Sequence, residues 1–371
     1  MIQTFRFNGL LLATFFLAAA CGADHSASGL PGVRMNQGAA AADVASSGRT
    51  PVSIESIETR RFSFTYAATI EGLPDAGPAH VYVPIAIETA HQRIEAFEVD
   101  APFAGRLEHE PVFGNRFWHG ILESGQESTT VTVRYTVERK LLRKEPPDHP
   151  IGALGEAELR EMERFLKPNE RVVVGHEILT PILAEIRREA GPNDKSEIAR
   201  SIYDWVVDNI EYKKVGTGWG NGDTFWACGE RYGNCTDFHS LFISLARTEG
   251  IPARFEMGFP IPIDRAEGEI GGYHCWLEFY LDGVGWFPID ASEAFKHPEK
   301  RELFYGTHPA DRFHVTTGRD LRLGPDHRGP ALNYFIYPYV EVDGKSLSDR
   351  VETTFTYADL PPDGDGVRRG G

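Results

Sequence analysis

Apolar and polar residues alternate with a period of two over the first third of the chain after residue 50. Two of the alternating rows are Phe62, Phe64, Tyr66, Ala68 and Ile70, and Val131, Val133, Tyr135 and Val137. Turn-forming stretches such as 74–77 and 114–115 separate these segments. Because successive side chains of a strand point to opposite faces, this period predicts strands with one buried face. We expect an antiparallel β-sandwich over residues 51–140.

The apolar period becomes helical after a connector at 141–170. Helices are predicted from Thr180 to the Gly191–Pro192 pair, from Asp194, a helix-capping residue, and from Asn234 to Gly250. Further strands are predicted at 254–259, 273–281 and 286–290. The pattern therefore predicts an α+β core over 171–300, a C-terminal β extension over 301–360 and a disordered tail over 361–371.

The first twenty-one residues are typical of an export signal. Arg6 precedes an apolar segment, Gly9 to Ala20, that is too short to anchor the chain across a bilayer. The small residues before Cys21 resemble a bacterial lipobox, although Ala18 stands where the usual Leu would be; Ala18-x-Ala20 also fits ordinary signal cleavage. We expect export into the bacterial cell envelope, membrane attachment through a lipid on Cys21, and a flexible linker over 22–50.

The charge balance excludes one class of partner. With 38 Lys and Arg against 54 Asp and Glu, the formal net charge is −16. An acidic chain without a long basic run repels nucleic acid, so nucleic-acid binding is not expected. The hydrophobic fraction of 41% is typical of a chain with well-filled cores.

Cysteine usage singles out a free thiol. Apart from Cys21, three cysteines remain, namely Cys228, Cys235 and Cys275. An odd number in an oxidising compartment leaves at least one thiol unpaired, which needs a reason. We expect Cys235 to be free, with Cys228 and Cys275 either joined in a disulfide or buried as small apolar side chains.

Cys235 stands where a helix would activate its thiol. Asn234 is a plausible N-cap, which places Cys235 in the first turn of the predicted helix. The unpaired N–H groups and the dipole of that turn favour a negative charge and lower the pKa of a thiol. The same N–H groups can stabilise an oxyanion after attack on a carbonyl. A structural Cys at a helix start is the alternative.

A hairpin supplies the other two groups of a catalytic triad. His274 lies on an alternating strand, and the turn at 282–285 would return the chain antiparallel to it. Asp290 would then lie opposite a residue between about 274 and 277, close enough to hydrogen-bond the imidazole. A nucleophile, a base and an orienting acid are the parts of a thiol-dependent acyl transferase.

Four motifs in order resemble the transglutaminase-like superfamily, and most closely its bacterial exported branch, often described as cysteine proteases. They are Gly233-Asn234-Cys235-Thr236-Asp237-Phe238-His239, Gly250-Ile251-Pro252-Ala253-Arg254, Tyr273-His274-Cys275-Trp276-Leu277-Glu278-Phe279 and Gly285-Trp286-Phe287-Pro288-Ile289-Asp290-Ala291-Ser292. The resemblance implies a papain-like core with Cys235 as nucleophile, His274 as base and Asp290 as its orienter. It implies acyl transfer through a thioester on a peptide or protein substrate, with water or an amine as acceptor.

Several alternatives remain beside this hypothesis. Trp219, Trp226 or Tyr212 could supply a second oxyanion donor. Cys235 and His239, four residues apart, could bind zinc together with another Cys, but we expect no metal or cofactor, and no sequence resembles a calcium loop. The chain could also be a non-catalytic binding or scaffolding protein tethered to the envelope. The sequence does not decide the oligomeric state.

Overall fold

The computed structural model describes residues 34–35, 53–74, 77–123, 125, 127–190 and 193–361. The predicted signal segment, its cleavage site and Cys21 lie outside the described residues. So do the predicted linker, apart from β1 (Arg34–Met35), and the predicted tail beyond residue 361. Among the helices of the described residues, none has the length and apolar character needed to cross a membrane.

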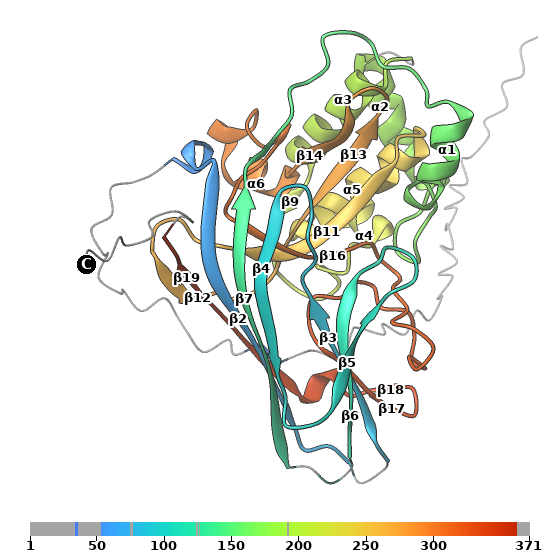
Figure 1. Ribbon diagram of the computed structural model, residues 1–371. Coiled ribbons are helices and arrows are strands. Elements are labelled where there is room, and N and C mark those ends of the chain that lie inside the picture. Colours follow the sequence, from blue (N-terminus) through green and yellow to red (C-terminus); the bar gives the residue numbers. More distant parts are fainter. Residues whose placement is uncertain are drawn as a thin grey trace, which may run out of the picture. The chain divides into compact units, whose positions relative to one another are not determined.

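Two antiparallel sheets form the sandwich (Figure 1). The first sheet has the order β1-β19-β2-β7-β4, and β12 pairs with β19. Apart from β1, its strands are β19 Val351–Asp359, β2 Thr59–Glu71, β7 Ser128–Lys140, β4 Gln92–Asp100 and β12 Glu267–Glu269. The second has the order β18-β17-β3-β6-β5, with bounds β18 Lys345–Ser346, β17 Tyr339–Val342, β3 Ala79–Ile85, β6 Arg116–Leu122 and β5 Gly105–His109. The rows that alternate in the sequence, such as Phe62 to Ile70, are the buried faces.

The C-terminal strands complete the sandwich. The sequence placed them in a separate extension over 301–360. In the structure, β19 pairs along its full length with β2, from Val351 opposite Ile70 to Asp359 opposite Phe62. β17 pairs with β3 in the other sheet. Local periodicity shows that a segment is a strand, but it carries no information on which distant strand it pairs with.

The core between these segments combines a four-stranded antiparallel sheet with helices. Its sheet order is β14-β13-β11-β16, with bounds β14 Gly285–Ile289, β13 His274–Leu281, β11 Ala253–Pro260 and β16 Arg312–Thr317. The helices are α1 Glu156–Met162, α2 Thr180–Ala190, α3 Lys195–Asn209, α4 Thr224–Glu230, α5 Cys235–Thr248 and α6 Ala291–Lys296. Short pairs join β9 (Glu211–Tyr212) to β10 (Tyr232–Gly233) and β8 (Leu142–Arg143) to β15 (Thr307–His308). The predicted α+β class is confirmed.

The core sheet and the sandwich share one hydrophobic interior. The Phe64 ring of β2 lies 5.1 Å from that of Phe259 on β11 and 4.6 Å from that of Phe313 on β16, measured between centroids. Gln92 of β4 adds a polar clamp, because its amide nitrogen donates to the His314 carbonyl and its amide oxygen accepts from the His314 N–H, both at 2.8 Å. The sandwich therefore supports the core sheet directly.

The core sheet has an apolar face and a polar face. Cys275, Leu277 and Phe279 of β13 belong to the buried apolar cluster that includes α5. The intervening positions carry His274, Trp276 and Glu278, and all three are buried as well. Because the sandwich covers this second face, its charged groups must find partners inside the protein. The candidate site lies at one end of the polar face.

Candidate active site

Asn234 caps the helix that begins at Cys235. Its side-chain oxygen accepts a hydrogen bond from the Thr236 N–H at 2.8 Å, and the Asp237 carboxylate accepts one from the Asn234 N–H at 2.9 Å. These reciprocal bonds make the capping box that fixes the first turn. Cys235 is thus held at the positive end of a 14-residue helix, as the sequence predicts.

Asp237 also ties a glycine-rich loop to this turn. Its carboxylate accepts from the Gly220 N–H at 2.6 Å and the Gly222 N–H at 3.0 Å. Burial raises the pKa of Asp237 to about 6 despite these bonds. Gly233 is needed just before the helix, because a Cβ at this position would collide with the Asp237 side chain.

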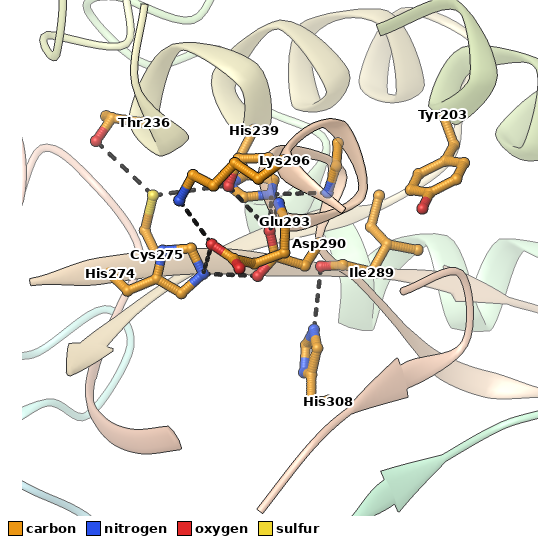
Figure 2. Close-up of polar contacts among 12 residues, drawn as sticks. Tyr203, Thr236, His239, His274, Cys275, Ile289, Asp290, Glu293, Lys296 and His308 are labelled. Carbon is orange, nitrogen blue, oxygen red and sulfur yellow. Dashed lines mark hydrogen bonds and ion pairs between the residues drawn. The ribbon is translucent and has the colours of Figure 1, made fainter. Parts of the chain in front are cut away.

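His274 and Asp290 meet through the predicted hairpin. Leu277 of β13 pairs with Ile289 of β14, which places Asp290 one residue beyond the paired strand and opposite the start of β13. The His274 Nε2 lies 2.6 Å from the Asp290 Oδ2, and both side chains are buried (Figure 2). Asp290 is also the N-cap of α6, where its other oxygen accepts from the Glu293 N–H at 2.9 Å. The helix cap thereby orients the carboxylate toward the imidazole.

The Cys235 thiol and the His274 imidazole are electrostatically coupled, because the imidazole lowers the pKa of the thiol and the thiol raises the pKa of the imidazole. Since Nε2 of His274 faces Asp290, Nδ1 is the nitrogen left for the sulfur. Burial opposes the charged form of Cys235, yet hydrogen bonds from Cys275 and His274 and the charge of His274 hold the pKa of this thiol well below its usual range. Burial likewise opposes the charged form of His274, but the Asp290 carboxylate raises its pKa to about 10. The favoured state is a thiolate–imidazolium pair.

A second thiol lies beside the first but has the opposite character. Cys275 Sγ lies 3.6 Å from His239 Nδ1 and 3.7 Å from Thr236 Oγ1 (Figure 2). Burial raises the pKa of Cys275 well above its usual value, and the neighbouring Cys235 thiolate raises it further. Cys275 therefore stays protonated, and its S–H lies within hydrogen-bonding reach of Thr236 Oγ1. The electrostatics single out Cys235 as the nucleophile.

His239 lies beneath the site, between the Ala291 backbone and the Cys275 thiol. Its Nε2 accepts a hydrogen bond from the Ala291 N–H at 3.2 Å and lies 3.5 Å from Asp290 Oδ1. A ring nitrogen that accepts carries no proton, so Nδ1 holds the proton and faces Cys275.

The three described cysteines are free thiols. The alternative disulfide between Cys228 and Cys275 is therefore not formed, and Cys275 is a buried thiol. Cys228 is half-buried on α4, and burial raises its pKa to about 11. Each of the three thiols thus has a distinct environment, and only Cys235 has a lowered pKa.

Of the three aromatic candidates for a second oxyanion donor, one remains open. The indole N–H of Trp219 donates to the Gly216 carbonyl at 3.1 Å, and that of Trp226 donates to the Tyr232 carbonyl at 2.9 Å. The Tyr212 hydroxyl donates no hydrogen bond to any of the described residues. Burial and the nearby Cys235 charge raise the pKa of Tyr212, so its hydroxyl keeps its proton. Tyr212 is the one with a free donor.

The comparisons with known proteins agree with this geometry. Residues 184–291 match the model of the Transglutaminase-like superfamily. These residues form a transglutaminase-like core. The matched segment contains Cys235, His274 and Asp290, and the family resemblance drawn from the four sequence motifs is confirmed.

Two similar proteins extend the comparison. An uncharacterized protein from Haemophilus influenzae is 31% identical over 202 residues, covering 46% of this chain and 54% of the relative, so the chain spans about half the length of the curated relative that it matches. The crystal structure of a "Putative Cysteine Protease" from Cytophaga hutchinsonii superposes with a TM-score of 0.58 at 18% identity, covering 82% of this chain and 92% of the other. The second likeness shows a shared fold that extends beyond the transglutaminase-like core.

Arg312 is a site residue that the sequence motifs did not reveal. It lies on β16, outside the segment matched as the transglutaminase-like core, and its Nη2 lies 2.7 Å from Asp290 Oδ2 with both side chains buried. The same carboxylate oxygen thus receives the imidazole and the guanidinium. Although burial opposes its charge, His274 and Arg312 hold the pKa of Asp290 well below its usual range. Only the position of Arg312 in phase with the buried residues of its strand could have signalled this role.

A tyrosine cluster borders the nucleophile turn. The Tyr273 hydroxyl accepts from the Asn234 side-chain amide at 3.1 Å and lies 3.0 Å from Thr236 Oγ1. Its ring lies 5.7 Å from that of Tyr334 and 5.9 Å from that of Tyr337, between centroids. Segments far outside the transglutaminase-like core therefore line its nucleophile helix.

Metal-ligating side chains converge elsewhere in the described residues. The two groups are Glu108 with His119 and Asp326, and Glu256 with Glu278 and His308. Arginines already bridge the acids in both groups: Arg106 contacts Glu108 and Asp326, and Arg254 contacts Glu256 and Glu278. Neither group includes a member of the Cys235–His274–Asp290 relay.

Proposed function

We propose that this chain is a thiol-dependent acyl-transfer enzyme that acts on peptide or protein amides through Cys235, His274 and Asp290. The supporting observation is the buried His274–Asp290 pair together with the lowered pKa of the Cys235 thiol, to which the charge of His274 contributes. The transglutaminase-like family match over residues 184–291 supports the same chemistry.

The reaction begins with the Cys235 thiolate, which attacks the amide carbonyl carbon. The backbone N–H groups of the first turn of α5 stabilise the resulting oxyanion, with the Tyr212 hydroxyl as second donor. The imidazolium of His274 then gives its Nδ1 proton to the leaving amine, and a thioester forms on Cys235. His274 takes a proton from the acceptor, which attacks the thioester and releases the thiolate.

The acceptor decides the product. Water gives hydrolysis of the amide, and a primary amine gives a new amide bond. Cys235 is 3% exposed and His274 is 6% exposed, so only a small part of either side chain is accessible to a substrate. The loop at 260–271 is anchored to the sandwich, because its strand β12 pairs with β19.

We also propose that the enzyme is exported and attached to the bacterial envelope through a lipid on Cys21. The support is the apolar N-terminal segment that ends in small residues before this Cys. Metabolic labelling with a fatty-acid analogue tests it: label should enter the full chain and be lost in Cys21→Ser. Equal labelling of that variant would contradict the attachment.

Two thiol variants test the catalytic assignment. Cys235→Ala should abolish both iodoacetamide labelling at mildly acidic pH and turnover of an amide substrate. Cys275→Ala removes the neighbouring thiol, whose raised pKa makes it unreactive, and should keep the labelling. Labelling that persists in Cys235→Ala and disappears in Cys275→Ala would show that Cys275, and not Cys235, is the nucleophile.

A glutamine-peptide library, incubated with and without a primary amine, tests the reaction class. Mass spectrometry distinguishes deamidation or cleavage from amine incorporation. Wild-type protein should give one of these products, and Cys235→Ala should give none. Absence of any product from wild-type protein, with Cys235 unreactive, would instead favour the non-catalytic binding role.

A further inference from the structure

Arg139 is a buried cation whose side chain makes no direct hydrogen bond or ion pair with the described residues, although the charges of Glu256 and Glu278 act on it from a longer distance. It lies at the end of β7, in phase with the inward-facing Val133, Tyr135 and Val137, and is 3% exposed. Within the described part of the chain, no hydrogen bond or ion pair engages its guanidinium, and its Nε is buried without an acceptor. Burial lowers the pKa of Arg139 to about 10, so the group remains charged at neutral pH. A buried charge without a direct partner destabilises the folded protein, because the loss of hydration is not compensated.

Its neighbour on the next strand shows what the fold normally supplies. Arg60 of β2 is the register partner of Arg139 and is buried too. Its Nε lies 2.8 Å from Asp359 Oδ1, and its two terminal nitrogens donate to the Ile261 and Pro262 carbonyls. Two inward-facing arginines lie side by side, but among the described residues only Arg60 has a carboxylate and carbonyl oxygens as direct partners.

Arg139 lines a cavity of about 230 Å³ where the sandwich meets the polar face of the core sheet. The exposed residues Thr89 and Ala90 form part of its wall and connect it to solvent. Trp286 and Leu142 supply apolar wall. The space suits a small organic group as well as water.

The charges that line the cavity leave a positive excess. Glu256 and Glu278 both pair with Arg254, whose Nε lies 3.1 Å from Glu256 Oε1. Lys144 donates to the Val284 carbonyl and, like Arg139, has no carboxylate partner among the described residues. Two acids therefore face three cations. Burial and the charge of Glu256 also raise the pKa of Glu278 to about 7, which increases the excess near neutral pH.

A second polar atom in the wall is also unpaired. His314 Nε2 lies 3.1 Å from the Thr316 carbonyl and donates to it, which leaves Nδ1 as an acceptor. That Nδ1 is buried without a partner among the described residues. The cavity therefore presents the Arg139 guanidinium, which can bind an anion, and in the same wall a His314 nitrogen that can accept a hydrogen bond from an N–H group.

We propose that this cavity binds a carboxylate group, held by the Arg139 guanidinium. A planar guanidinium matches a carboxylate through two parallel hydrogen bonds. The nearby Glu256 and Glu278 disfavour a doubly charged phosphate, so a singly charged carboxylate fits better. The carboxylate can belong to a small acid or to the C-terminus of a short peptide, whose amide N–H could also reach His314 Nδ1.

The test measures binding to the full-length protein by calorimetry and by thermal unfolding. The probes are propionate, N-acetyl-alanyl-alanine and the C-terminal amide of that dipeptide, with inorganic phosphate as the doubly charged anion. At least one carboxylate probe should bind saturably and raise the Tm, while the amide and phosphate should bind at least about tenfold more weakly. Stronger binding of the dipeptide would assign the site to peptide termini, and equal or stronger binding of propionate would assign it to small acids.

Arg139→Met should abolish carboxylate binding, and Arg139→Lys, which keeps the charge without the fork, should weaken it at least about tenfold. Arg60→Met is the matched control. Without probe, Arg60→Met should lower the Tm because it removes the ion pair with Asp359 and two hydrogen bonds to backbone carbonyls, whereas Arg139→Met should leave the Tm unchanged or raise it. Carboxylate binding that is absent from wild-type protein or unchanged in Arg139→Met would overturn the proposal, as would equal Tm losses in the two methionine variants.

Discussion

The two ends of the polar face of the core sheet treat buried charge in different ways. At one end, Asp290 receives His274, Arg312 and the backbone of α6, so each oxygen has partners. At the other end, Arg254 pairs with both Glu256 and Glu278, and Arg139 makes no direct ion pair in the described chain. Between them lies Trp276, whose indole N–H donates to Glu256 at 2.8 Å.

This difference separates a site that is complete from one that is not. Around Asp290 the protein itself supplies every opposite charge, which fixes the protonation states that the proposed thiol chemistry needs. Around Arg139 the protein supplies the cation and the cavity but not the anion. Buried charges on one sheet face can therefore mark either a preorganised reaction centre or a place for a ligand.

Among the proposed variants, Asp290→Asn should cause the largest loss of activity. The amide cannot hold His274 as an imidazolium, so the thiolate–imidazolium pair is lost. By analogy with the loss of the acid in other triads, turnover should fall about 10³- to 10⁴-fold. Single-turnover acylation by an activated ester, followed by mass spectrometry, measures it. A loss under about tenfold would show that the acid is not part of the machinery.

Arg312→Met should cost less activity but shift a pH dependence. Misplacing the carboxylate by about an ångström should lower kcat about 10²-fold with little change in KM. Arg312 holds the pKa of Asp290 down, and a lowered carboxyl pKa gives stability that is present above the unfolded value and lost as pH falls through the folded value. Without Arg312 the folded pKa of Asp290 should rise toward the unfolded value, so the acid-side loss should be smaller and should be complete at a higher pH.

Acid unfolding curves and kinetics of Arg312→Met measure both effects, with Arg312→Lys as the variant that keeps the charge. The lysine should restore the acid-unfolding profile in large part and kcat only in part, because it lacks the fork. Arg254→Lys is a matched control on the same face that does not touch Asp290. Equal kinetic losses in Arg254→Lys and Arg312→Met would show that Arg312 acts on catalysis only by stabilising the sheet and not by positioning Asp290.

Alkylation of Cys235 should sharpen the contrast between the two neighbouring thiols. The reactive pair should persist from mildly acidic pH up to about 10, where His274 loses its proton. Because the folded pKa of His274 is raised, its contribution to stability is fully present below the unfolded value of about 6.5 and lost as pH rises through about 10. Iodoacetamide rates in Cys275→Ala, followed against pH, measure this window. An ordinary thiol profile, rising only above about pH 8, would refute the ion pair.

Trp276→Phe should give the smallest effect on catalysis. It removes the hydrogen bond to the buried Glu256 carboxylate and should cost about 1–3 kcal/mol in the free energy of unfolding. The relay at Asp290 keeps all its partners, so kcat should change less than about twofold if the two ends are independent. Denaturant unfolding and steady-state kinetics measure the pair of values. A large kcat loss would show that the two ends are coupled.

Much of the local structure could be predicted from the sequence. The Asn234 cap, the alternation of β13 and the turn after it are local features, and they are enough to bring His274 opposite Asp290. Arg312 could not be predicted in this way. It lies 22 residues beyond Asp290 on a strand that no hairpin links to β14, so only the sheet order brings its guanidinium to the carboxylate.

The joining of the C-terminal strands to the sandwich was hidden for the same reason. The alternation of β19 shows that one face is buried, yet 279 residues separate the start of this strand from the end of its partner β2. Arg139 is a subtler case, because its phase in β7 predicts burial while the sequence around it gives no sign of a missing partner. Arg60 has the same phase on the next strand and finds its carboxylate in Asp359.

The sequence alone determined the three longest helices and three strands of the core sheet, where the nucleophile helix begins, and which three residue types could form a relay, because helix caps, turns and periodicity act over a few residues. The tertiary structure decided which thiol is activated, which cation holds Asp290, and which buried arginine has no partner. Those outcomes depend on burial and on the charges of groups distant in the chain, since only packing sets the solvent exposure and the separations that govern electrostatic energy.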